Sequence, residues 1–486
     1  MHRVQAAFLV LAVGLQLQAQ TINLSGKVTG VGGKAVHGAI VTLKSNNLID
    51  TTDADGNYTL SGTLTSVKSA ISKSGCEAIY LKNNVVAVKL SQPAPISVRL
   101  FNMQGKQLHN FTASHTSAGD YHFSLNDLSL AENMMIVHVS TGRLTASFRY
   151  VPHLNSTASH LDGSSGGIKL AKSLADNETL EASALGYKTK SSPITTFTGT
   201  VDITLESEFT GECTQSRNAN KNVSGSGPHR VVVETNSAPG INEGTIFRPE
   251  DLGYGKKYPI YVWGNGACNL NGTDNSAALA QIASHGYFVI SDGKPDGSGA
   301  RNMDINSMRA PALKYISWII AENRKPCSAY YNSIDTTKVA GNGFSCGGYL
   351  GMGIASDPRT TTWGVSSSGS FGDNPELWNS VHTPVLILEG NKDVPPGGTG
   401  AYNNGLRDYN GIAPKGHPIM FFSNKNMGHG GDLWAANGGD FTRINLAWLN
   451  WWLKGDTGAT GKKVLVGPDC RYCTDSNWEV KSANIP

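Results

Sequence analysis

The chain has 486 residues, which is enough for two to four domains of ordinary size. Charged residues make up 16% of it, against about 25% in an average soluble protein, and this excludes a charge-rich disordered chain. The net charge of +3 is too small to indicate a nucleic-acid partner or an anionic membrane surface. Glycine is abundant, with 56 residues, and predicts many turns and much β structure.

The N-terminus has the pattern of a secretory signal peptide over residues 1–19. Arg3 supplies the positive start, Ala6–Leu17 is an apolar run, and Leu17–Ala19 is an acceptable cleavage site. The apolar run is too short to span a bilayer, and no later segment offers about 18 consecutive apolar residues. We therefore expect a secreted or cell-surface protein, exported by this signal peptide and without a membrane span.

Short β-branched runs alternate with turn residues in the first half of the chain. Residues 20–94, with Ala39–Leu43 and Tyr58–Leu60 as expected strands, have the pattern of a small β-sandwich. Residues 95–207 form a second β region. Its last runs, over 179–207, either complete the first β-domain or belong to a new one.

The pattern changes after a polar linker at residues 208–229. In residues 230–486, strand-like runs alternate with helical ones, and runs such as Val385–Leu388 are apolar throughout, as in parallel strands covered on both faces. The sequence thus predicts an α/β fold with a doubly wound, mostly parallel sheet, preceded by an all-β, sandwich-like accessory region. The expected helices are Asn275–His285, a helix within Met308–Glu322, and Ile444–Lys454.

A Gly-x-Ser-x-Gly sequence at Gly343–Gly347 makes Ser345 the candidate nucleophile. The motif is weak by itself, since Gly163–Gly167 also matches it around Ser165. Only Ser345 lies between a strand-like run and a helix-like run, which is the context that a nucleophile turn requires. The alternative for Ser345 is an ordinary glycine-rich turn.

A serine nucleophile needs a base, and the base needs a group that orients it. Asp393 lies in the loop beyond the expected strand Val385–Leu388, and His429 lies between two glycines after a short apolar run. Glu389 and Asp373 are weaker candidates for the acid. The sequence predicts a catalytic triad of Ser345, Asp393 and His429, and the alternatives are a solvated loop carboxylate and a surface histidine.

An oxyanion needs two backbone N–H donors. Cys346, directly after the nucleophile, is one candidate. The glycine-rich loop that follows Trp263 supplies the other, with Ala267 as first choice and Gly266 as second. We expect no metal and no cofactor, because the sequence lacks a His-Glu-x-x-His motif and its one Cys-x-x-Cys lacks zinc partners.

Aromatic residues near the predicted site are candidates for substrate binding, and core packing is the alternative explanation for each of them. Trp378 is the first candidate, followed by Trp263 and Phe371, while Tyr349 and Trp434 are further aromatic residues near the site.

Seven cysteines in an exported chain make disulfides possible. We expect Cys213 to pair with Cys470 or Cys473, which would tie the ends of the second half together. A bond from Cys268 to Cys327 is possible. Cys346 is expected to be a buried free thiol.

These motifs together resemble the α/β-hydrolase superfamily, specifically its secreted cutinase-like and polyester-hydrolase-like (dienelactone hydrolase-type) branch. The resemblance covers residues 231 to about 477, and rests on the loop after Trp263 and on segments 283–290, 343–348, 383–387 and 428–429, with the terminal cysteine pair. Segment 52–58 resembles the carboxypeptidase regulatory-like β-sandwich, and residues 95–151 resemble the sorting-type β-domain of type 9 secretion substrates.

The sequence therefore predicts a secreted serine esterase that acts through an acyl-enzyme. By analogy with plant cell-wall-degrading systems, we expect acetyl or feruloyl esters on polysaccharide as substrate, and a monomeric enzyme without a nucleic-acid partner. One alternative is a cutinase-like polyester hydrolase. Another is a non-catalytic carbohydrate-binding or adhesion protein.

Overall fold

A computed structural model describes most of the chain. The described residues are 20–44, 47–64, 78–82, 85–90, 92–102, 106–125, 135–141, 144–150, 178–213, 216–236, 238, 240–253, 255–394 and 398–486. The predicted signal peptide and the second Gly-x-Ser-x-Gly sequence, around Ser165, lie outside these residues.

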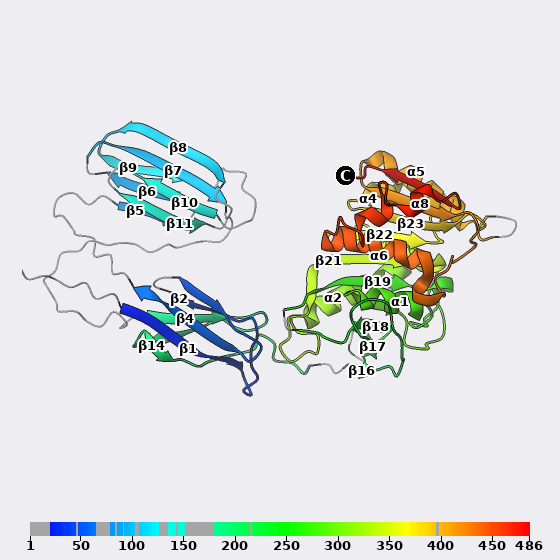
Figure 1. Ribbon diagram of the computed structural model, residues 1–486, viewed down its shortest axis with the longest axis horizontal. Helices are drawn as coiled ribbons and strands as arrows, with labels where there is room; N and C mark the ends of the chain where they lie inside the picture. The colour runs from blue at the N-terminus through cyan, green and yellow to red at the C-terminus, as the bar shows by residue number, and fades with distance from the viewer. Residues whose placement is uncertain are drawn as a thin grey trace, which may run out of the picture. The chain divides into compact units, whose positions relative to one another are not determined.

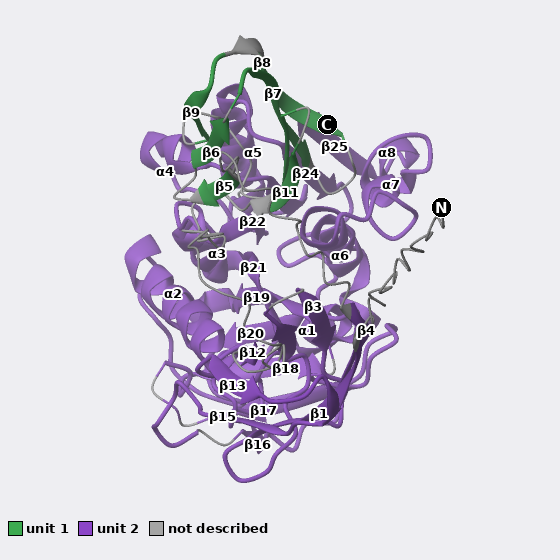
Figure 2. Cartoon of the chain, turned by 90° about the vertical axis from the view of Figure 1, so that its left-hand side faces the viewer, with its two compact units in different colours: residues 1–19, 65–174 green, residues 20–64, 175–486 purple. Residues whose placement is uncertain are grey.

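The chain divides into two compact units (Figure 2). Residues 65–174, together with 1–19, form unit 1, and unit 2 combines residues 20–64 with 175–486. Unit 1 is thus inserted into the sequence of unit 2. This division differs from the predicted boundary at residue 94, because strands on both sides of the insertion share one β-sandwich.

The sandwich of unit 2 consists of two four-stranded sheets, shown in Figure 1. One sheet has the order β14-β1-β15, with β4 beside β1, and the other has the order β13-β12-β2-β3. Buried and half-buried residues alternate along β12, as expected of strands with one face on a core. The strands are β1 (Gln20–Gly30), β2 (Ile40–Leu43), β3 (Leu48–Thr51), β4 (Asn57–Leu64), β12 (Glu178–Ser183), β13 (Lys190–Ile194), β14 (Thr198–Thr200) and β15 (Ile203–Leu205).

Unit 1 has its own apolar core between two sheets. One sheet has the order β11-β10-β7-β8 and the other β5-β6-β9. Its strands are β5 (Ala78–Lys82), β6 (Val85–Leu90), β7 (Ala94–Asn102), β8 (Gln107–Thr116), β9 (Gly119–Ser124), β10 (Met135–Ser140) and β11 (Thr145–Tyr150).

A ten-stranded mixed sheet dominates the rest of unit 2, in the order β16-β17-β18-β20-β19-β21-β22-β23-β24-β25. The strands from β20 to β24 pair in parallel, whereas both margins are antiparallel. The predicted mostly parallel sheet therefore holds only for the centre. The strands are β16 (Arg217–Asn218), β17 (Val231–Thr235), β18 (Gly244–Pro249), β19 (Tyr258–Gly264), β20 (Phe288–Asp292), β21 (Ile334–Gly343), β22 (Thr360–Ser366), β23 (Val385–Gly390), β24 (Ile419–Asn424) and β25 (Trp478–Ala483).

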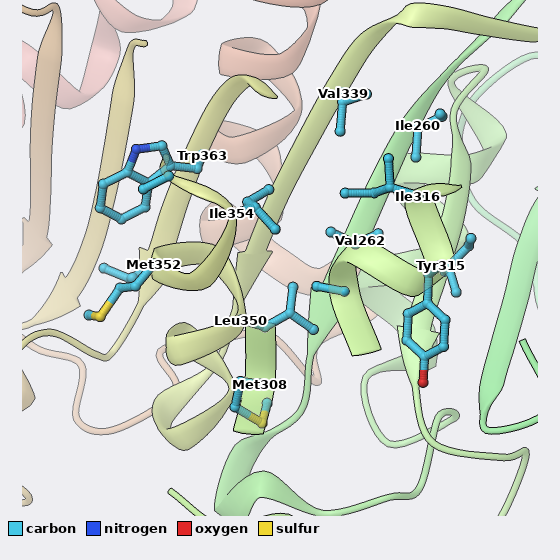
Figure 3. Packing of buried hydrophobic residues seen from close by; sticks show 14 of the residues in the cluster. Ile260, Val262, Met308, Tyr315, Ile316, Val339, Leu350, Met352, Ile354 and Trp363 are labelled. Carbon is cyan, nitrogen blue, oxygen red and sulfur yellow. The ribbon is translucent and has the colours of Figure 1, made fainter. Parts of the chain in front are cut away.

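Helices accompany this sheet, and two apolar clusters pack between helices and strands. Figure 3 shows one of them, where Ile316 and Leu350 lie beside Val262 and Val339 of the central strands. Strands β19 and β23 are buried at every position, which explains why their sequences are apolar apart from Glu389 near the end of β23. The α-helices are α1 (Ser276–Ser284), α2 (Ile305–Glu322), α3 (Gly348–Ile354), α4 (Pro375–Ser380), α5 (Ala401–Ile412), α6 (Gly439–Lys454), α7 (Lys462–Leu465) and α8 (Arg471–Thr474).

The predicted helices of the second half correspond to α1, α2 and α6. Helix α2 begins at the cap Asp304, whose carboxylate accepts a 2.8 Å hydrogen bond from the amide of Ser307. Helix α6 ends at Gly455, which adopts the left-handed conformation with φ of 70°. The predicted linker 208–229 is partly structured, because it contains β16.

Candidate functional site

The candidate site lies at the carboxyl ends of parallel strands. Strand β21 leads to Ser345, β23 leads to Asp393 and β24 leads to His429. Because these strands run in parallel in one sheet, their carboxyl ends share one edge. Residues distant in the sequence are thereby brought together.

Ser345 occupies a tight turn between β21 and α3, with φ of 55°. This left-handed conformation is strained for a non-glycine residue. The turn lies so close to the end of β19 that a Cβ on Gly347 would stand 2.2 Å from the carbonyl carbon of Gly264. Glycine is therefore required at position 347 by close backbone approach, and the half-buried Ser345 is held at a sharp bend.

Ser345, His429 and Asp393 form a hydrogen-bonded chain. The Oγ atom of Ser345 lies 2.8 Å from Nε2 of His429, and Nδ1 of His429 lies 2.5 Å from Oδ2 of Asp393. An ionised carboxylate can only accept, so Nδ1 carries the ring proton. Nε2 is then free to accept the hydroxyl proton of Ser345, which is the arrangement that a general base requires.

Asp393 is fully buried, yet it stays ionised. Burial raises the pKa of the Asp393 carboxyl, but hydrogen bonds from His429 and Thr399 outweigh that effect, and the pKa is lowered. The amide and the hydroxyl of Thr399 donate to Oδ1 at 2.6 and 2.9 Å. Sequence reasoning missed Thr399, since no motif marks a threonine six residues after the acid.

The carboxylate that accepts the described hydrogen bond from Nδ1 of His429 belongs to Asp393 and to neither of the two weaker acid candidates. Glu389 is fully buried beside the amide of Ser368, and burial raises its pKa well above the usual range, which favours the neutral form. Asp373 has a side chain that is 82% exposed and pairs with Arg407 at 3.8 Å. Asp393 is thus the acid that the geometry favours.

The loop of His429 is fixed by a hydrogen bond and by aromatic packing. The amide of Gly430 donates to the hydroxyl of Ser367 at 2.9 Å. The rings of Phe344 and His429 have centroids 4.9 Å apart, and Trp434 meets Phe344 edge-on at 5.1 Å. These contacts limit the positions open to the imidazole.

The two candidate oxyanion amides lie on adjacent turns. Ala267 is exposed within the short helical turn Gly266–Cys268, and Cys346 is buried in the turn Ser345–Gly347. A disulfide joins Cys268 to Cys346, with Cα atoms 5.1 Å apart. Gly266, the second choice, is buried against the ring of Phe344, so Ala267 is the more accessible donor.

The predicted substrate-binding aromatics have different environments. Trp263 is only 1% exposed and its indole donates to Asn275 at 3.1 Å, so it is a core residue and offers no binding surface. Trp378 of α4 is half-buried, and its indole donates to Asp408 of α5 at 2.8 Å, which fixes the ring against α5. Phe371 is 64% exposed and stacks on Tyr349, four residues after Ser345.

Trp434, which the sequence offers only as a further candidate, is better placed for substrate binding than these three residues. It is 51% exposed and packs on Phe344 beside His429. The signal that could have found it was its position five residues after the histidine, in the same loop. Trp434 and Phe371 are the exposed aromatic side chains near the triad among the described residues.

The predicted disulfide pairings are wrong. Cys213 bonds to Cys327 rather than to the C-terminal pair, and Cys470 bonds to Cys473. Cys268 bonds to Cys346, so it is not paired with Cys327, and Cys346 is not a free thiol. The reason is spatial, because a disulfide needs Cα atoms within about 7 Å, and the folded turns, not the sequence spacing, supply that distance.

A hollow of about 360 Å³ lies apart from these groups. None of the candidate site residues lines it. Its polar lining includes Ser226, Gln281, His285, Asn437, Arg443 and Asn450.

The described residues show neither a metal-binding cluster nor a membrane-spanning helix. No group of three or more histidine, cysteine or acidic side chains there is arranged to hold a metal ion. No helix within the same residues combines the length and the apolar character needed to cross a membrane.

The sequence matches no protein-family model and no curated protein. The prediction that the chain belongs to the α/β-hydrolase superfamily is therefore wrong on these comparisons. The same holds for the two family resemblances in the N-terminal half. The ten-stranded sheet is mixed, and the other described strands belong to small β-sheets of three or four strands.

Proposed function

We propose that this protein is a serine hydrolase that cleaves carboxylic esters. The observation that carries the proposal is the continuous hydrogen-bonded path from Ser345 Oγ through His429 to Asp393. A serine hydroxyl is a weak nucleophile until a neighbouring base removes its proton, and the base works best when a third group holds its tautomer. The three side chains supply these three roles.

In the proposed reaction, Ser345 attacks the ester carbonyl while His429 takes the hydroxyl proton. Asp393 stabilises the imidazolium that forms. The amides of Cys346 and Ala267 are the proposed donors to the oxyanion. His429 then passes its proton to the leaving alcohol, and water repeats the sequence on the acyl-enzyme.

The exposed aromatic residues favour an ester with an aromatic or apolar acyl part. Trp434 is exposed and packs on Phe344, and Phe371 is exposed and stacks on Tyr349 of the helix that follows Ser345. Aromatic rings stack on planar groups and on sugar faces, so feruloyl esters of polysaccharide are the leading substrate class. An aromatic polyester presents the same kind of face and is the alternative.

We also propose that the protein is secreted. Three disulfides are compatible with an oxidising, extracellular compartment, because the cytosol keeps most thiols reduced.

The direct test compares Ser345→Ala with Ser165→Ala on p-nitrophenyl acetate. Without the nucleophile no acyl-enzyme forms, so we expect Ser345→Ala to lower kcat by about 10⁴-fold or more. Ser165→Ala, in the second copy of the motif, is expected to retain full activity. Equal losses in both variants, or an inactive wild type, would refute the proposal.

A substrate panel then separates the classes of ester. Methyl ferulate, acetylated xylan and an aromatic polyester film are compared at equal enzyme concentration, with a p-nitroanilide as the amide control. We expect the highest kcat/KM on methyl ferulate. Binding to xylan without turnover of any ester would favour the adhesion or carbohydrate-binding alternative.

A further inference from the structure

The disulfide Cys268–Cys346 joins the two turns that carry the candidate oxyanion amides. Each cysteine directly neighbours a key residue, since Cys346 follows the nucleophile Ser345 and Cys268 follows Ala267. Both cysteines are buried, with exposures of 2% and 8%. The other two disulfides involve none of the candidate site residues.

The backbone of both turns is strained. Ser345, Ala267 and Cys268 have φ values of 55°, 54° and 49°, in the left-handed region that L-residues avoid. Such conformations persist only where the surrounding structure over-determines them. One covalent bond between two strained turns is a constraint of this kind.

The amides of Ala267 and Cys346 are not used to close these turns in the described structure. In the first turn, the bond is donated by the amide of Asn269 to the carbonyl of Gly266 at 3.0 Å. In the second, the amide of Gly347 donates to Phe344 at 2.8 Å. Since neither candidate amide closes its turn, each can donate a hydrogen bond to another acceptor.

Beyond Gly264, the hydrogen bonds of the first turn run to the end of β20 and the segment after it. The side-chain amide of Asn265 donates to the carbonyl of Asp292 at 2.6 Å, and the amide of Arg301 donates to the carbonyl of Cys268 at 2.9 Å. The amide of Phe344 donates to the carbonyl of Gly264 at 3.0 Å, which fixes the end of β19 against the nucleophile turn. Ala267 lies three residues further along and is exposed. The disulfide at Cys268 is what ties that end of the loop to the residue after the nucleophile.

We propose that Cys268 and Cys346 are positioning residues, and that their disulfide holds the Ala267 and Cys346 amides on one oxyanion. This inference rests on the proposed ester hydrolysis. Without the bond, Ala267 and Cys268 relax toward right-handed conformations and the Ala267 donor is lost. A dithiol cleaves the bond with two electrons, giving two cysteine thiols and the oxidised, cyclic form of the dithiol.

The test compares two double variants on p-nitrophenyl acetate. For Cys268→Ala/Cys346→Ala we expect kcat to fall by about 10²-fold or more, as when one oxyanion donor is removed, with KM changed less than about 3-fold. Cys470→Ala/Cys473→Ala removes a disulfide outside the site and is the matched control, with kcat unchanged. Equal kcat in both double variants would overturn the inference.

Two further readouts separate positioning from a general loss of structure. The pH profile of kcat/KM of the site variant should overlay that of the wild type, because the His429–Asp393 pair remains intact. Labelling of wild-type Ser345 by a fluorophosphonate tests the proposed function separately. An unlabelled wild type refutes the ester hydrolase, whereas a labelled wild type with a fully active site variant refutes only the role of the disulfide.

A reduction experiment covers the case in which the site variant fails to fold. The Cys470→Ala/Cys473→Ala protein is treated with dithiothreitol, and alkylated cysteines are counted by mass spectrometry over time. Activity should fall in step with alkylation of Cys346 and independently of Cys213. A loss that follows Cys213 instead, or full activity with Cys346 alkylated, contradicts the inference.

Discussion

At the scale of single residues, the site depends on a buried carboxylate that stays charged. Asp393 is stabilised by donors from His429 and Thr399, which together more than offset its burial. The Thr399 hydroxyl also lies 3.2 Å from Nδ1 of His429, so one side chain contacts both partners. The orientation of the imidazole is therefore set by the whole loop and not by the acid alone.

Replacing this carboxylate tests both its chemical role and its charge. Asp393→Asn should lower kcat on p-nitrophenyl acetate by about 10⁴-fold, because an amide does not hold the required tautomer. The lowered pKa also means that ionised Asp393 stabilises the folded state above the ordinary carboxyl pKa of about 4, and that this contribution is lost as the pH falls through the lower, folded-state value. The difference in unfolding free energy between wild type and variant, measured in urea, should shrink from pH 7 to pH 3.

Asp373→Asn is the matched control, since this exposed carboxylate is not at the histidine. It should leave kcat unchanged. A stability difference for Asp393→Asn that grows toward acid pH would contradict the assigned direction of its pKa.

The exposed aromatics are predicted to act in substrate binding rather than in folding. For Trp434→Ala and Phe371→Ala we expect KM for methyl ferulate to rise by about 2- to 10-fold, since one aromatic contact contributes about 0.5–1.5 kcal/mol. KM for methyl acetate should change little. Ile49→Ala, an apolar residue of the sandwich that is 50% exposed, is the control and should alter neither.

At the scale of elements, α6 ends in an exposed lysine whose ammonium contacts a carbonyl and an aromatic ring. The ammonium of Lys454 donates to the carbonyl of His285 at 2.5 Å and lies 4.0 Å from the ring centroid of Tyr287. Partial desolvation of its ammonium lowers the pKa of Lys454 to about 8. The end of this helix therefore carries a charge that the folded state disfavours.

The consequence is a pH-dependent stability with a defined sign. Below pH 8 Lys454 is charged in both states, and the cost of partly desolvating its ammonium is fully present. Between pH 8 and about 10.5 only the unfolded chain keeps the proton, so the cost is relieved as the pH rises. Relative to Lys454→Met, the wild type should thus gain unfolding free energy over this window, by much less than the full pKa shift implies, because solvent screens the exposed residue.

Chemical denaturation at pH 7, 8.5 and 10 measures this difference. The same series with Lys415→Met, which removes an exposed lysine, controls for general effects of alkaline solution. A wild type that loses stability relative to Lys454→Met as the pH rises would show that the shift has the opposite sign.

At the scale of the whole molecule, the N-terminal sandwich is assembled from two distant segments. Strand β1 pairs with β14 and β15, and β2 pairs with β12, across the inserted unit. Neither segment can form these sheets alone. The large sheet, by contrast, is formed entirely by residues after 216.

A truncated chain of residues 211–486 should therefore fold and hydrolyse p-nitrophenyl acetate within about 3-fold of the full-length rate. It keeps the ten-stranded sheet, the triad and the bond from Cys213 to Cys327. It loses the hydrogen bond from the Tyr331 hydroxyl to Leu185 at 2.6 Å, so a modest decrease in melting temperature is expected.

The informative comparison is a chain of residues 176–486. This chain keeps β12 to β15 but lacks their partners β1 and β2, which leaves unpaired strand edges. We expect it to aggregate where the shorter chain is soluble. A folded but inactive 211–486 chain would show that the sandwich is needed for the site.

The features of this protein that depend on local chemistry could be predicted from its sequence. The apolar runs of β20 and β23, the glycine stop of α6 and the glycine-flanked serine turn follow from burial and backbone sterics within a few residues. Ser345 is predicted from its motif between a strand-like and a helix-like run, and Asp393 and His429 from the loops that follow two later apolar runs.

Only the tertiary structure decided which distant residues meet. The pairing of Cys268 with Cys346, the part played by Thr399 and the completion of one sandwich by β12 to β15 all depend on separations in space that sequence spacing does not encode. The exposure of Trp434 and the burial of Trp263 are of the same kind, because a tryptophan's sequence neighbours do not determine which elements pack over it. Motifs report local backbone geometry, whereas disulfides, burial and sheet partners are set by the packing of the whole chain.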